Sequence, residues 1–507
     1  MVAYIVLKRE RTRDQAELDT YSQEVSASLT GQAVTTRAYY GRQEVLEGSA
    51  VEGVVILEFF EEAANRLRVA GSGASSETGL RDRMLREGLI FVGTCDIAGH
   101  VRGKGFPASE LHTRRKTGIG WTHSNLMQTA FGPILDTPFG TGGDLMIVPD
   151  PAAEVDVDFG DNSAPEHFFL GDIRNTDGTP WECCPREFLR RAIAALDEAG
   201  GLHLIAAFEQ EFVYTGNEDR PGDAYSLGAW RRQGIFGESF IAAIRAAGAE
   251  PDSFLPEYGP RQFEVTVKPA PALQAADRAV IAREMVRAAA FRLGHRAIFS
   301  PMPTAEGVGN GVHIHFSLRD ETGQPKTHDP DGPFGLSGNA AHFAAGVLAH
   351  LSAISAITAP SPVSYLRLTP NRWAPTVIDI VKQDRGAALR VCPVFAASKK
   401  KDIAKAFNLE FRVSDASASP YMALGALIFG GSDGIARKLA LPEPGTEAQP
   451  LPRSLGQALD NMEKSAAVQT WFSPTFLEAY LRHKRSELAH VAALDTPQLC
   501  ARYAEVY

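Results

Sequence analysis

Polar residues stand two positions apart in several short, otherwise apolar segments of this chain, and this spacing limits the fold more than any other feature. Side chains at positions i and i+2 of a β-strand point to the same face. Each strand would carry two titratable groups on one face. A sheet built from these strands would bring the groups of all the strands close together. The pairs are Glu209 and Glu211 in AAFEQEFVY, His313 and His315 in GVHIHFSL, and Glu410 and Arg412 in NLEFRVSD.

A fourth pair, Glu257 and Glu264, brackets a Gly-Pro turn in LPEYGPRQFEV. Taken singly, an E-x-E strand is most often a solvated face, and an H-x-H strand is as often a hydrogen-bonded core pair as a metal site. Here each pair stands beside β-branched or aromatic residues, where burial of an uncompensated charge is costly. Divalent cations would neutralise such carboxylates, and oxygen-rich ligation with one imidazole is typical of Mg²⁺ or Mn²⁺.

The length of 507 residues predicts two or three domains. The net charge of −10 argues against a nucleic-acid partner, because neutralising phosphates requires a basic surface. No apolar run is long enough to span a bilayer and no signal peptide is evident, so we expect a cytoplasmic protein without membrane contact. Neither a disulfide framework nor a zinc site is indicated by the spacing of the cysteines, which are Cys95, Cys183, Cys184, Cys392 and Cys500.

The stretch GSGASSETG, residues 71–79, has the composition of a flexible linker. Before it, VAYIVLK and VEGVVILEF are strand-like, while residues 13–29 and 58–69 are helix-like. This segment resembles the dimeric ferredoxin-like domains of a widespread family, and a degenerate extension is the alternative. Farther along, apolar residues at three- and four-residue spacing predict long helices over Arg186–Ala199, Ala272–Leu293, Ala340–Ile357 and Tyr421–Leu439.

Several blocks of the chain resemble the glutamine synthetase family and follow that family's order. NLEFRVSDASASPYMALGALIFGGSDGI is similar to its signature of an E-x-R strand, a Pro-Tyr helix and a glycine-rich end. GVGNGVHIHFSL resembles its glycine loop and H-x-H strand, and SYLRLTPNRWAP, DRGAALR, FEQEF and LPRSLGQALDNME also match. DIAGHVRGKGFP and GDLMIVPD resemble its N-terminal domain. The resemblance covers roughly residues 89–495 and implies an ATP-dependent carboxylate–amine ligase.

The resemblance implies two metal sites that together hold two to three Mg²⁺ or Mn²⁺ ions beside the substrate ATP. The first set would be Glu211, Glu257 and Glu264, and the second would be Glu209, His313 and Glu410. The ions would position the acceptor carboxylate and neutralise the phosphates while ATP converts glutamate to a γ-glutamyl phosphate. Because all six positions hold the expected residue type, the resemblance favours an active enzyme.

Arginines and a glycine complete the implied site. Arg385 and Arg390 match positions that hold transferring and terminal phosphates, for which planar guanidinium groups are well suited. Arg367 matches the residue that binds the α-carboxylate of the amino acid, and Arg412 the residue near its γ-carboxylate. Gly309 would offer a backbone carbonyl to the substrate amine, and His315 and Ser317 lie on the nucleotide side.

The chain departs from the ammonia-using members at two places. Trp373 stands where they carry a glutamate that closes the site, and the segment around Trp121 lacks the aspartate that helps them to bind ammonium. An indole offers an apolar wall and a cation–π face instead of negative charge. We therefore expect an organic amine as acceptor, such as an alkylamine, an arylamine or an amino alcohol. The alternative is that Trp373 merely packs and another carboxylate binds ammonium.

The expected fold class is α+β: a ferredoxin-like extension over residues 1–75, a β-grasp-like domain over 85–180, and a catalytic domain with a curved antiparallel sheet over 181–507. The resemblance also implies a ring-built homo-oligomer of twelve subunits, with sites between neighbours. The partners would be glutamate and a small organic amine. Rival functions are an ammonia-dependent glutamine synthetase, a non-catalytic relative, and phosphoryl transfer to a guanidino compound.

Overall fold

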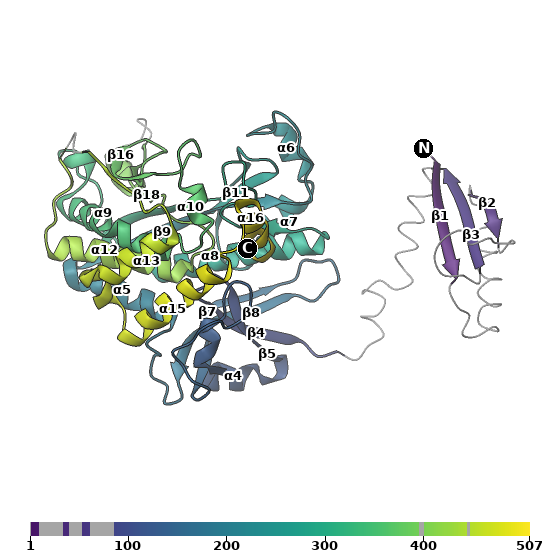
Figure 1. Ribbon diagram of the computed structural model, residues 1–507, viewed down its shortest axis with the longest axis horizontal. Helices are drawn as coiled ribbons and strands as arrows, with labels where there is room; N and C mark the ends of the chain where they lie inside the picture. Colours follow the sequence, from purple (N-terminus) through teal and green to yellow (C-terminus); the bar gives the residue numbers. More distant parts are fainter. Residues whose placement is uncertain (1, 10–33, 40–52, 61–85, 395–399, 444–446) are drawn as a thin grey trace. The chain divides into compact units, whose positions relative to one another are not determined.

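The computed structural model divides the chain into two compact units, Met1–Arg86 and Glu87–Tyr507 (Figure 1). The structure describes residues 2–9, 34–39, 53–60, 86–394, 400–443 and 447–507. All of the residues singled out above for chemistry fall within the second unit.

In the first unit, the described residues form a three-stranded antiparallel sheet of β1 (Val2–Arg9), β2 (Val34–Tyr39) and β3 (Gly53–Phe60) in the order β1-β3-β2. The two strands expected from the sequence are β1 and β3. Residues 58–60 belong to β3, so the helix expected to start at residue 58 is wrong there. The remainder of that helix and the helix expected over 13–29 lie outside the described residues.

The second unit begins with a five-stranded sheet in the order β5-β4-β8-β7-β6. Only β4 and β8 pair in parallel. Buried and more exposed residues alternate along much of β7, as expected for a strand with one face on a core. The elements are β4 (Leu89–Cys95), β5 (Val101–Pro107), α4 (Leu111–Thr117), β6 (Ile119–Thr122), β7 (Asp144–Val157) and β8 (Glu166–Asn175).

A nine-stranded sheet with the main order β10-β11-β9-β14-β18-β17-β16 forms the centre of the remaining part. The expected antiparallel pairing holds for every pair except β16 and β17, which run parallel. Its strands are β9 (Leu202–Tyr214), β10 (Pro251–Pro256), β11 (Gln262–Val267), β12 (Ala270–Pro271), β13 (Ala297–Ile298), β14 (Ile314–Asp320), β16 (Ile380–Lys382), β17 (Leu389–Val391) and β18 (Leu409–Phe411).

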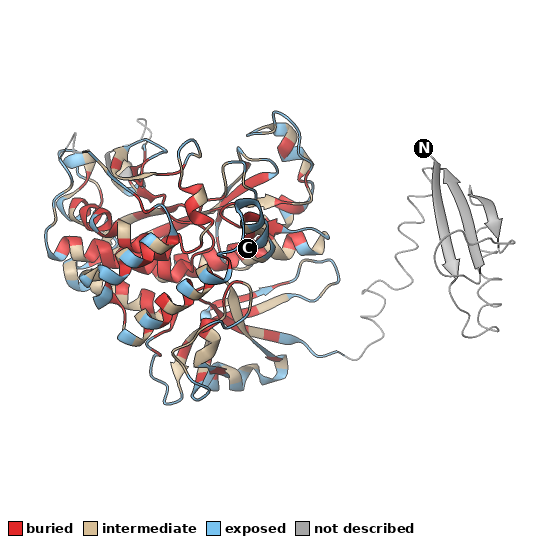
Figure 2. Ribbon diagram, in the orientation of Figure 1, coloured by how far each residue is buried: buried red, intermediate tan, exposed pale blue. Residues whose placement is uncertain are grey.

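Long helices pack beside this sheet and bury most of its apolar residues (Figure 2). The four predicted from the sequence are α5 (Pro185–Gly200), α8 (Ala272–Arg292), α9 (Gly338–Thr358) and α12 (Pro420–Ala436). The others are α6 (Leu227–Arg232), α7 (Phe236–Ala246), α10 (Ser364–Arg367), α11 (Lys400–Ala406), α13 (Leu455–Lys464), α14 (Ala466–Trp471), α15 (Pro474–His490) and α16 (Thr496–Val506). Helix α12 ends three residues before the predicted Leu439.

Helices α9 and α12 approach each other closely because both carry glycine at their crossing. A Cβ atom on Gly346 would lie 2.2 Å from the Gly430 carbonyl oxygen and 2.6 Å from the Gly434 Cα, so a larger residue does not fit. Helix α9 is long and apolar enough to pass for a membrane span, but 83% of its most apolar window is buried inside the protein. Its apolarity is accounted for by this central position in the core.

Arg186 at the start of α5 joins the five-stranded sheet to the helical layer. Its guanidinium is fully buried and contacts Asp277 on α8 at 2.8 Å, Asp172 on β8 at 2.6 Å and Asp150 on β7 at 3.0 Å. The Tyr421 hydroxyl on α12 donates to the same Asp277 carboxylate at 2.6 Å. Strands β7 and β8 and helices α8 and α12 are thereby held around one cation on α5.

Candidate active site

The charged pairs gather on one face of the nine-stranded sheet, as their spacing predicted. In the strand registers Glu211 lies opposite Glu264, and Glu209 opposite Thr266. Across the next pairings Glu410 lies between His315 and Arg390. Because directly paired residues of adjacent strands point to the same side, these side chains share one surface.

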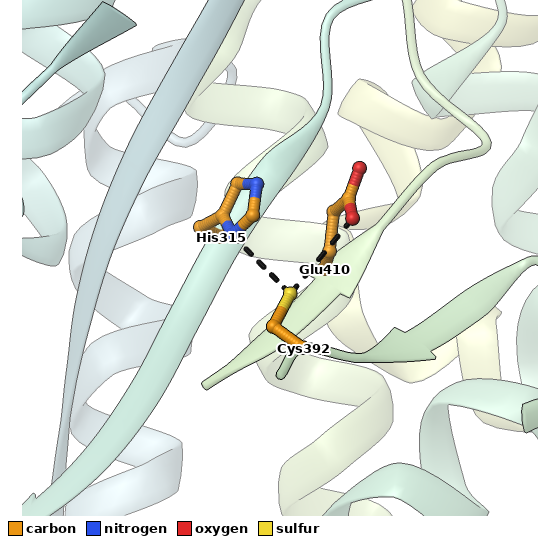
Figure 3. A group of neighbouring side chains, drawn as sticks. All are labelled: His315, Cys392 and Glu410. Carbon is orange, nitrogen blue, oxygen red and sulfur yellow. Dashed lines mark hydrogen bonds between the residues drawn. The ribbon is translucent and has the colours of Figure 1, made fainter. Parts of the chain in front are cut away.

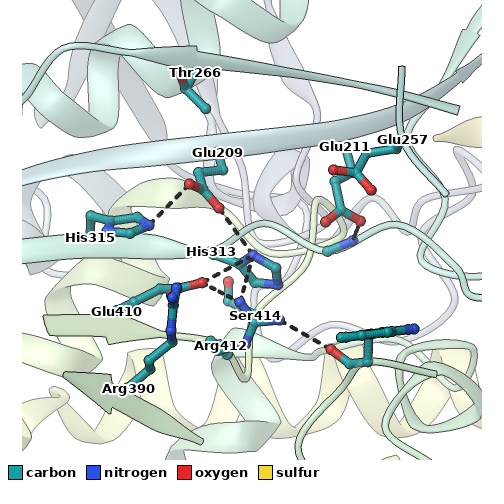
Figure 4. Close-up of polar contacts among 12 residues, drawn as sticks. Glu209, Glu211, Glu257, Thr266, His313, His315, Arg390, Glu410, Arg412 and Ser414 are labelled. Atoms are coloured by element: carbon teal, nitrogen blue, oxygen red, sulfur yellow. Dashed lines mark hydrogen bonds and ion pairs between the residues drawn. The ribbon is translucent and has the colours of Figure 1, made fainter. Parts of the chain in front are cut away.

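The second predicted ligand set is tightly clustered (Figure 4). Glu209, His313 and Glu410 each offer a ligand atom, and the three atoms lie within 4.8 Å of one another. His313 Nδ1 is 3.1 Å from Glu209 and 3.4 Å from Glu410. Glu410 is almost fully buried and also pairs with Arg390 at 2.6 Å and with Arg412.

The neighbours of this cluster keep its carboxylates charged. Burial alone would raise the pKa of Glu209, but hydrogen bonds from His313 and His315 lower it. The pKa of Glu410 falls to about 2, because His313 and Arg412 outweigh its burial. Burial and the adjacent Arg412 lower the pKa of His313 to about 4, so its imidazole is neutral at pH 7 and able to act as a ligand.

The first predicted set is arranged more loosely. Glu211, Glu257 and Glu264 line the same cavity of about 430 Å³, but they do not form one of the two tight ligand groups found among the described residues. Glu211 accepts a hydrogen bond from the Gly311 amide at 2.7 Å. Glu257 instead accepts from the Tyr225 hydroxyl and from the Tyr258 amide, each at 3.0 Å.

Electrostatic repulsion within this first set calls for a cation. Burial, opposed by the Gly311 amide and reinforced by Glu257, raises the pKa of Glu211 to about 7. Burial together with Glu209, Glu211 and Glu257 raises the pKa of Glu264 well above its ordinary value. Carboxylates in such an environment are stabilised in their charged form by a divalent ion. The donor chemistry therefore fits the divalent metals of the family.

The four arginines predicted from the sequence lie at the cavity or directly behind it. Arg367, Arg385 and Arg412 line it, and Arg367 is buried with Nη2 donating to the Ser414 carbonyl at 2.8 Å. Arg390 does not line this cavity and is paired with Glu410 behind it. Its predicted contact with a phosphate would require the guanidinium to turn from Glu410 or to use its other nitrogens.

The side-chain amides of Gln262 and Asn310, which the sequence analysis did not identify, hold the predicted glycine loop. Gly309 has φ of +80°, and a Cβ there would lie 2.3 Å from the Pro301 carbonyl oxygen, so glycine is required. The Gln262 amide donates to the Gly309 carbonyl at 2.7 Å and to the Asn310 side chain at 2.8 Å. The Gly309 carbonyl is thus already fixed on one side by Gln262.

Three exposed aromatic side chains line the mouth of the cavity: Tyr225, Tyr258 and Trp373 are 61%, 55% and 63% exposed. Trp373 has φ of +53°, a strained conformation for a large residue, and its carbonyl accepts a hydrogen bond from Arg412 at 3.1 Å. Trp121, by contrast, is buried on β6 among core residues. It lines neither this cavity nor the second cavity described below.

A second cavity of about 340 Å³ lies on the other side of Glu209 and contains the predicted nucleotide-side residues His315 and Ser317. His315 Nε2 is 3.0 Å from Glu209, which lines both cavities. Lys405 and Arg319 also line this space and supply positive charge beside it. Two cavities that share Glu209 suit two substrates that must meet at one point.

Sequence reasoning missed several residues of the site. Gln262 precedes Glu264 by two positions and shares its face of β11, which was the available signal. Arg372 precedes Trp373 and binds the carbonyls of Gly307 and, at 3.1 Å, Ala305, but no pattern marked it. Cys392 follows Arg390 by two positions and reaches the ligand cluster.

A five-stranded and a nine-stranded sheet, with an acidic, histidine-bearing face on the larger one, agree with the glutamine synthetase-like fold that the sequence predicts. The family model for the glutamine synthetase catalytic domain matches residues 182–503, and that for the glutamine synthetase N-terminal domain matches residues 81–181. The chain belongs to the glutamine synthetase family, whose members are ATP-dependent ligases. The family assignment and the α+β fold class expected from the sequence are confirmed.

Relatives within the family differ in their acceptors. A gamma-glutamylpolyamine synthetase of Streptomyces coelicolor is 32% identical over 466 residues, which cover 85% of this chain and 96% of that protein. A glutamine synthetase of Pyrococcus abyssi is 30% identical over 444 residues, covering 82% and 94%. A solved structure described as a novel glutamine synthase homolog is 41% identical, covers 84% of this chain and 100% of its own, and has a TM-score of 0.79.

Proposed function

We propose that this protein activates the γ-carboxylate of glutamate as an acyl phosphate with ATP and condenses it with an organic amine to give a γ-glutamyl amide. The supporting observation is the lining of the main cavity. Every carboxylate that lines it among the described residues, Glu209, Glu211, Glu257 and Glu264, belongs to the proposed metal-binding set. No further acidic group there is left to hold ammonium.

The proposed roles of the chain's residues are those that the resemblance to the glutamine synthetase family implies. Glu211, Glu257 and Glu264 would hold one Mg²⁺ or Mn²⁺, and Glu209, His313 and Glu410 another; the ions supply charge neutralisation of carboxylate and phosphate oxygens. Arg367 orients the α-carboxylate of glutamate, and Arg412 lies beside its γ-carboxylate. Arg385 and Arg390 stabilise the transferring phosphoryl group, and His315 and Ser317 bind the nucleotide.

The aromatic mouth supports an acceptor with an apolar substituent. Trp373 does not pack within its own subunit, because 63% of its surface is exposed in a conformation that disfavours large side chains. An apolar group packed against Trp373, Tyr225 and Tyr258 would be removed from water and contribute about 1.5–3 kcal/mol. The relative described as a gamma-glutamylpolyamine synthetase also supports an amine acceptor.

The test is a steady-state assay of purified full-length protein with glutamate, ATP and Mg²⁺ against ammonium, alkylamines, arylalkylamines, amino alcohols and polyamines. We expect an organic amine with an apolar substituent to give the highest kcat/KM. In Trp373→Glu this value should fall roughly 10- to 100-fold, in keeping with the lost apolar contact. Trp230→Glu, at an exposed tryptophan outside the cavity lining, should keep the wild-type order of acceptors.

Three outcomes would contradict parts of this proposal. Ammonium outperforming every amine by kcat/KM would make the chain a glutamine synthetase. No ATP turnover with any acid and amine would favour a non-catalytic relative. A stable phosphorylated product without an amide would indicate transfer to a guanidino compound. We also propose that the chain forms a homo-oligomer, in which the segment around Trp121 would lie beside a neighbour's acceptor site while the indole itself stays in the core of its own subunit.

A further inference from the structure

Cys392 lies against the ligand face from the end of β17, in a place that none of the proposed ligase roles uses (Figure 3). Its Sγ is 3.6 Å from His315 Nδ1 and 3.8 Å from Glu410 Oε2. The three ligand atoms lie within 4.8 Å of one another, and they come from or directly follow three adjacent strands. The group is therefore a second cluster, distinct from Glu209, His313 and Glu410 although it shares Glu410.

We propose that Cys392, His315 and Glu410 bind a thiophilic divalent cation, Zn²⁺ in particular, in competition with the Mg²⁺ or Mn²⁺ of the ligase. Sulfur is a ligand that Zn²⁺ prefers and Mg²⁺ avoids, so this cluster separates the two kinds of ion. On binding, the Cys392 thiol and the Nδ1–H of His315, which faces the Asn408 oxygen, each release a proton to solvent. The thiolate sulfur, the imidazole nitrogen and the carboxylate oxygen then occupy three positions around the ion.

The distances suit a tetrahedral ion. Zn–S and Zn–N bonds of about 2.3 and 2.05 Å place sulfur and nitrogen about 3.6 Å apart at a tetrahedral angle. The observed separation of Cys392 Sγ and His315 Nδ1 is 3.6 Å. The slightly longer separation to Glu410 requires only a small closing movement of one side chain.

The other nitrogen of His315 has the partner that a metal-binding histidine needs. Its Nε2 is 3.0 Å from a carboxylate oxygen of Glu209. Zinc-binding histidines commonly donate their second N–H to a carboxylate, which orients the ring and leaves the first nitrogen free to ligate. Glu209 therefore positions His315 for a metal at Nδ1.

One neighbour opposes the proposed ligation. The Asn408 side-chain oxygen is 2.8 Å from His315 Nδ1, and the Asn408 amide donates to the Ala406 carbonyl at 2.9 Å. This oxygen competes with a cation for the same nitrogen, so Asn408 must turn aside when the ion binds. Removing the competing oxygen should strengthen binding.

The surrounding charges are compatible with a bound cation. The Cys392 thiolate and the Glu410 carboxylate would neutralise the two charges of the ion. Since Cys392 and His315 each release a proton when the divalent ion binds, the net charge beside Arg390 and Arg412, both paired with Glu410, does not change. Because Zn²⁺ would engage Glu410 and draw His315 and Glu209 together, the proposed second Mg²⁺ set would lose two of its ligands.

Metal binding without turnover tests this proposal, so its failure is distinguishable from failure of the proposed ligase function. Full-length protein freed of metal with a chelator is titrated with Co²⁺, which takes the geometry of Zn²⁺ and reports a sulfur ligand by near-ultraviolet thiolate-to-metal absorption. We expect this absorption in the wild type and its loss on adding Zn²⁺. Its absence from the wild-type spectrum would overturn the proposal.

Substitutions at three positions sharpen the test. Cys392→Ser, with Cys392→Ala as a second version, should abolish the absorption and weaken Zn²⁺ binding by about tenfold or more. Cys500→Ser changes a buried cysteine of a separate core cluster and should keep both. Asn408→Ala should tighten Zn²⁺ binding.

Enzymatic inhibition gives an independent readout. In the Mg²⁺-supported reaction, Zn²⁺ should inhibit the wild type, and excess Mg²⁺ should relieve the inhibition. The Zn²⁺ concentration for half inhibition should rise about tenfold in Cys392→Ser, measured against that variant's own uninhibited rate. Equal Zn²⁺ affinity in Cys392→Ser and wild type would assign Zn²⁺ to Glu209, His313 and Glu410 and overturn the proposal.

Discussion

Replacing Arg186 by methionine tests whether one buried cation joins the five-stranded sheet of the second unit to its helices. The guanidinium is 0% exposed, and its carboxylate partners Asp277 and Asp172 are 9% and 14% exposed. Removing one partner of a buried ion pair leaves the others uncompensated and costs about 3–5 kcal/mol. Methionine nearly fills the space, so the loss is mainly electrostatic.

This free energy predicts a measurable change in Tm. The second unit runs from Glu87 to Tyr507, or 507 − 86 = 421 residues. An unfolding entropy of about 2.1 cal/mol/K per residue gives roughly 0.9 kcal/mol/K, so Tm should fall by about 3–6 °C in Arg186→Met. Arg190→Met is the matched control, because Arg190 pairs with the same Asp172 but is 33% exposed, and it should lower Tm by about 1 °C or less.

The pH dependence supplies a second check by calorimetry. Burial already raises the pKa of Asp277, against the lowering effect of Arg186. Without Arg186 this pKa rises further, so the folded variant is penalised when Asp277 is charged and relieved when it is protonated. The Tm deficit of Arg186→Met should therefore shrink as the pH is lowered from 7 toward about 5. A deficit that grows on acidification, or one no larger than that of Arg190→Met, would refute this reasoning.

Three further outcomes are expected. Glu264→Gln should maintain or raise the Tm of the metal-free protein, because burial and neighbouring carboxylates disfavour its charge, while reducing the Tm increase produced by Mg²⁺ in a thermal-shift titration. Gln262→Leu should raise the KM for glutamate roughly tenfold and leave the KM for ATP nearly unchanged, because it frees the Gly309 carbonyl. Arg372→Gln should release the Gly307 loop and lower kcat/KM for the amine, with faster amide hydrogen exchange of that loop as the structural readout.

The sequence predicted the face of the catalytic sheet because a strand's period of two is insensitive to detail. Glu209 and Glu211 share a side in any extended strand, whatever packs around them. The ends of elements were less predictable: α12 stops at Ala436, although the apolar spacing continues to Leu439. There Lys438 has φ of +51°, a local turn that apolar spacing does not encode.

Contacts between strands could not be predicted from spacing within one strand. No C-x-x-C motif marks Cys392 as a metal ligand. Its two proposed co-ligands come from β14 and β18, which are separate strands, so no short spacing in the sequence connects the three residues. Likewise, the pairing of Arg390 with Glu410 depends on the register of β17 and β18, which only the folded sheet defines. The sequence identified residue types suited to the chemistry, while the sheet register decides which of them meet.

The two halves of the proposed reaction rest on different kinds of structure. The activating residues Glu209, Glu211 and Glu410 stand on paired strands whose neighbours restrict every side chain. The acceptor residues Tyr258 and Trp373 lie outside the named helices and strands, and both are more than half exposed. Substitutions there change what the cavity mouth contacts without disturbing the sheet's hydrogen bonds. Acceptor specificity can therefore change while the activation chemistry is retained. Two relatives with similar sequence identity to this chain are accordingly described as a gamma-glutamylpolyamine synthetase and a glutamine synthetase.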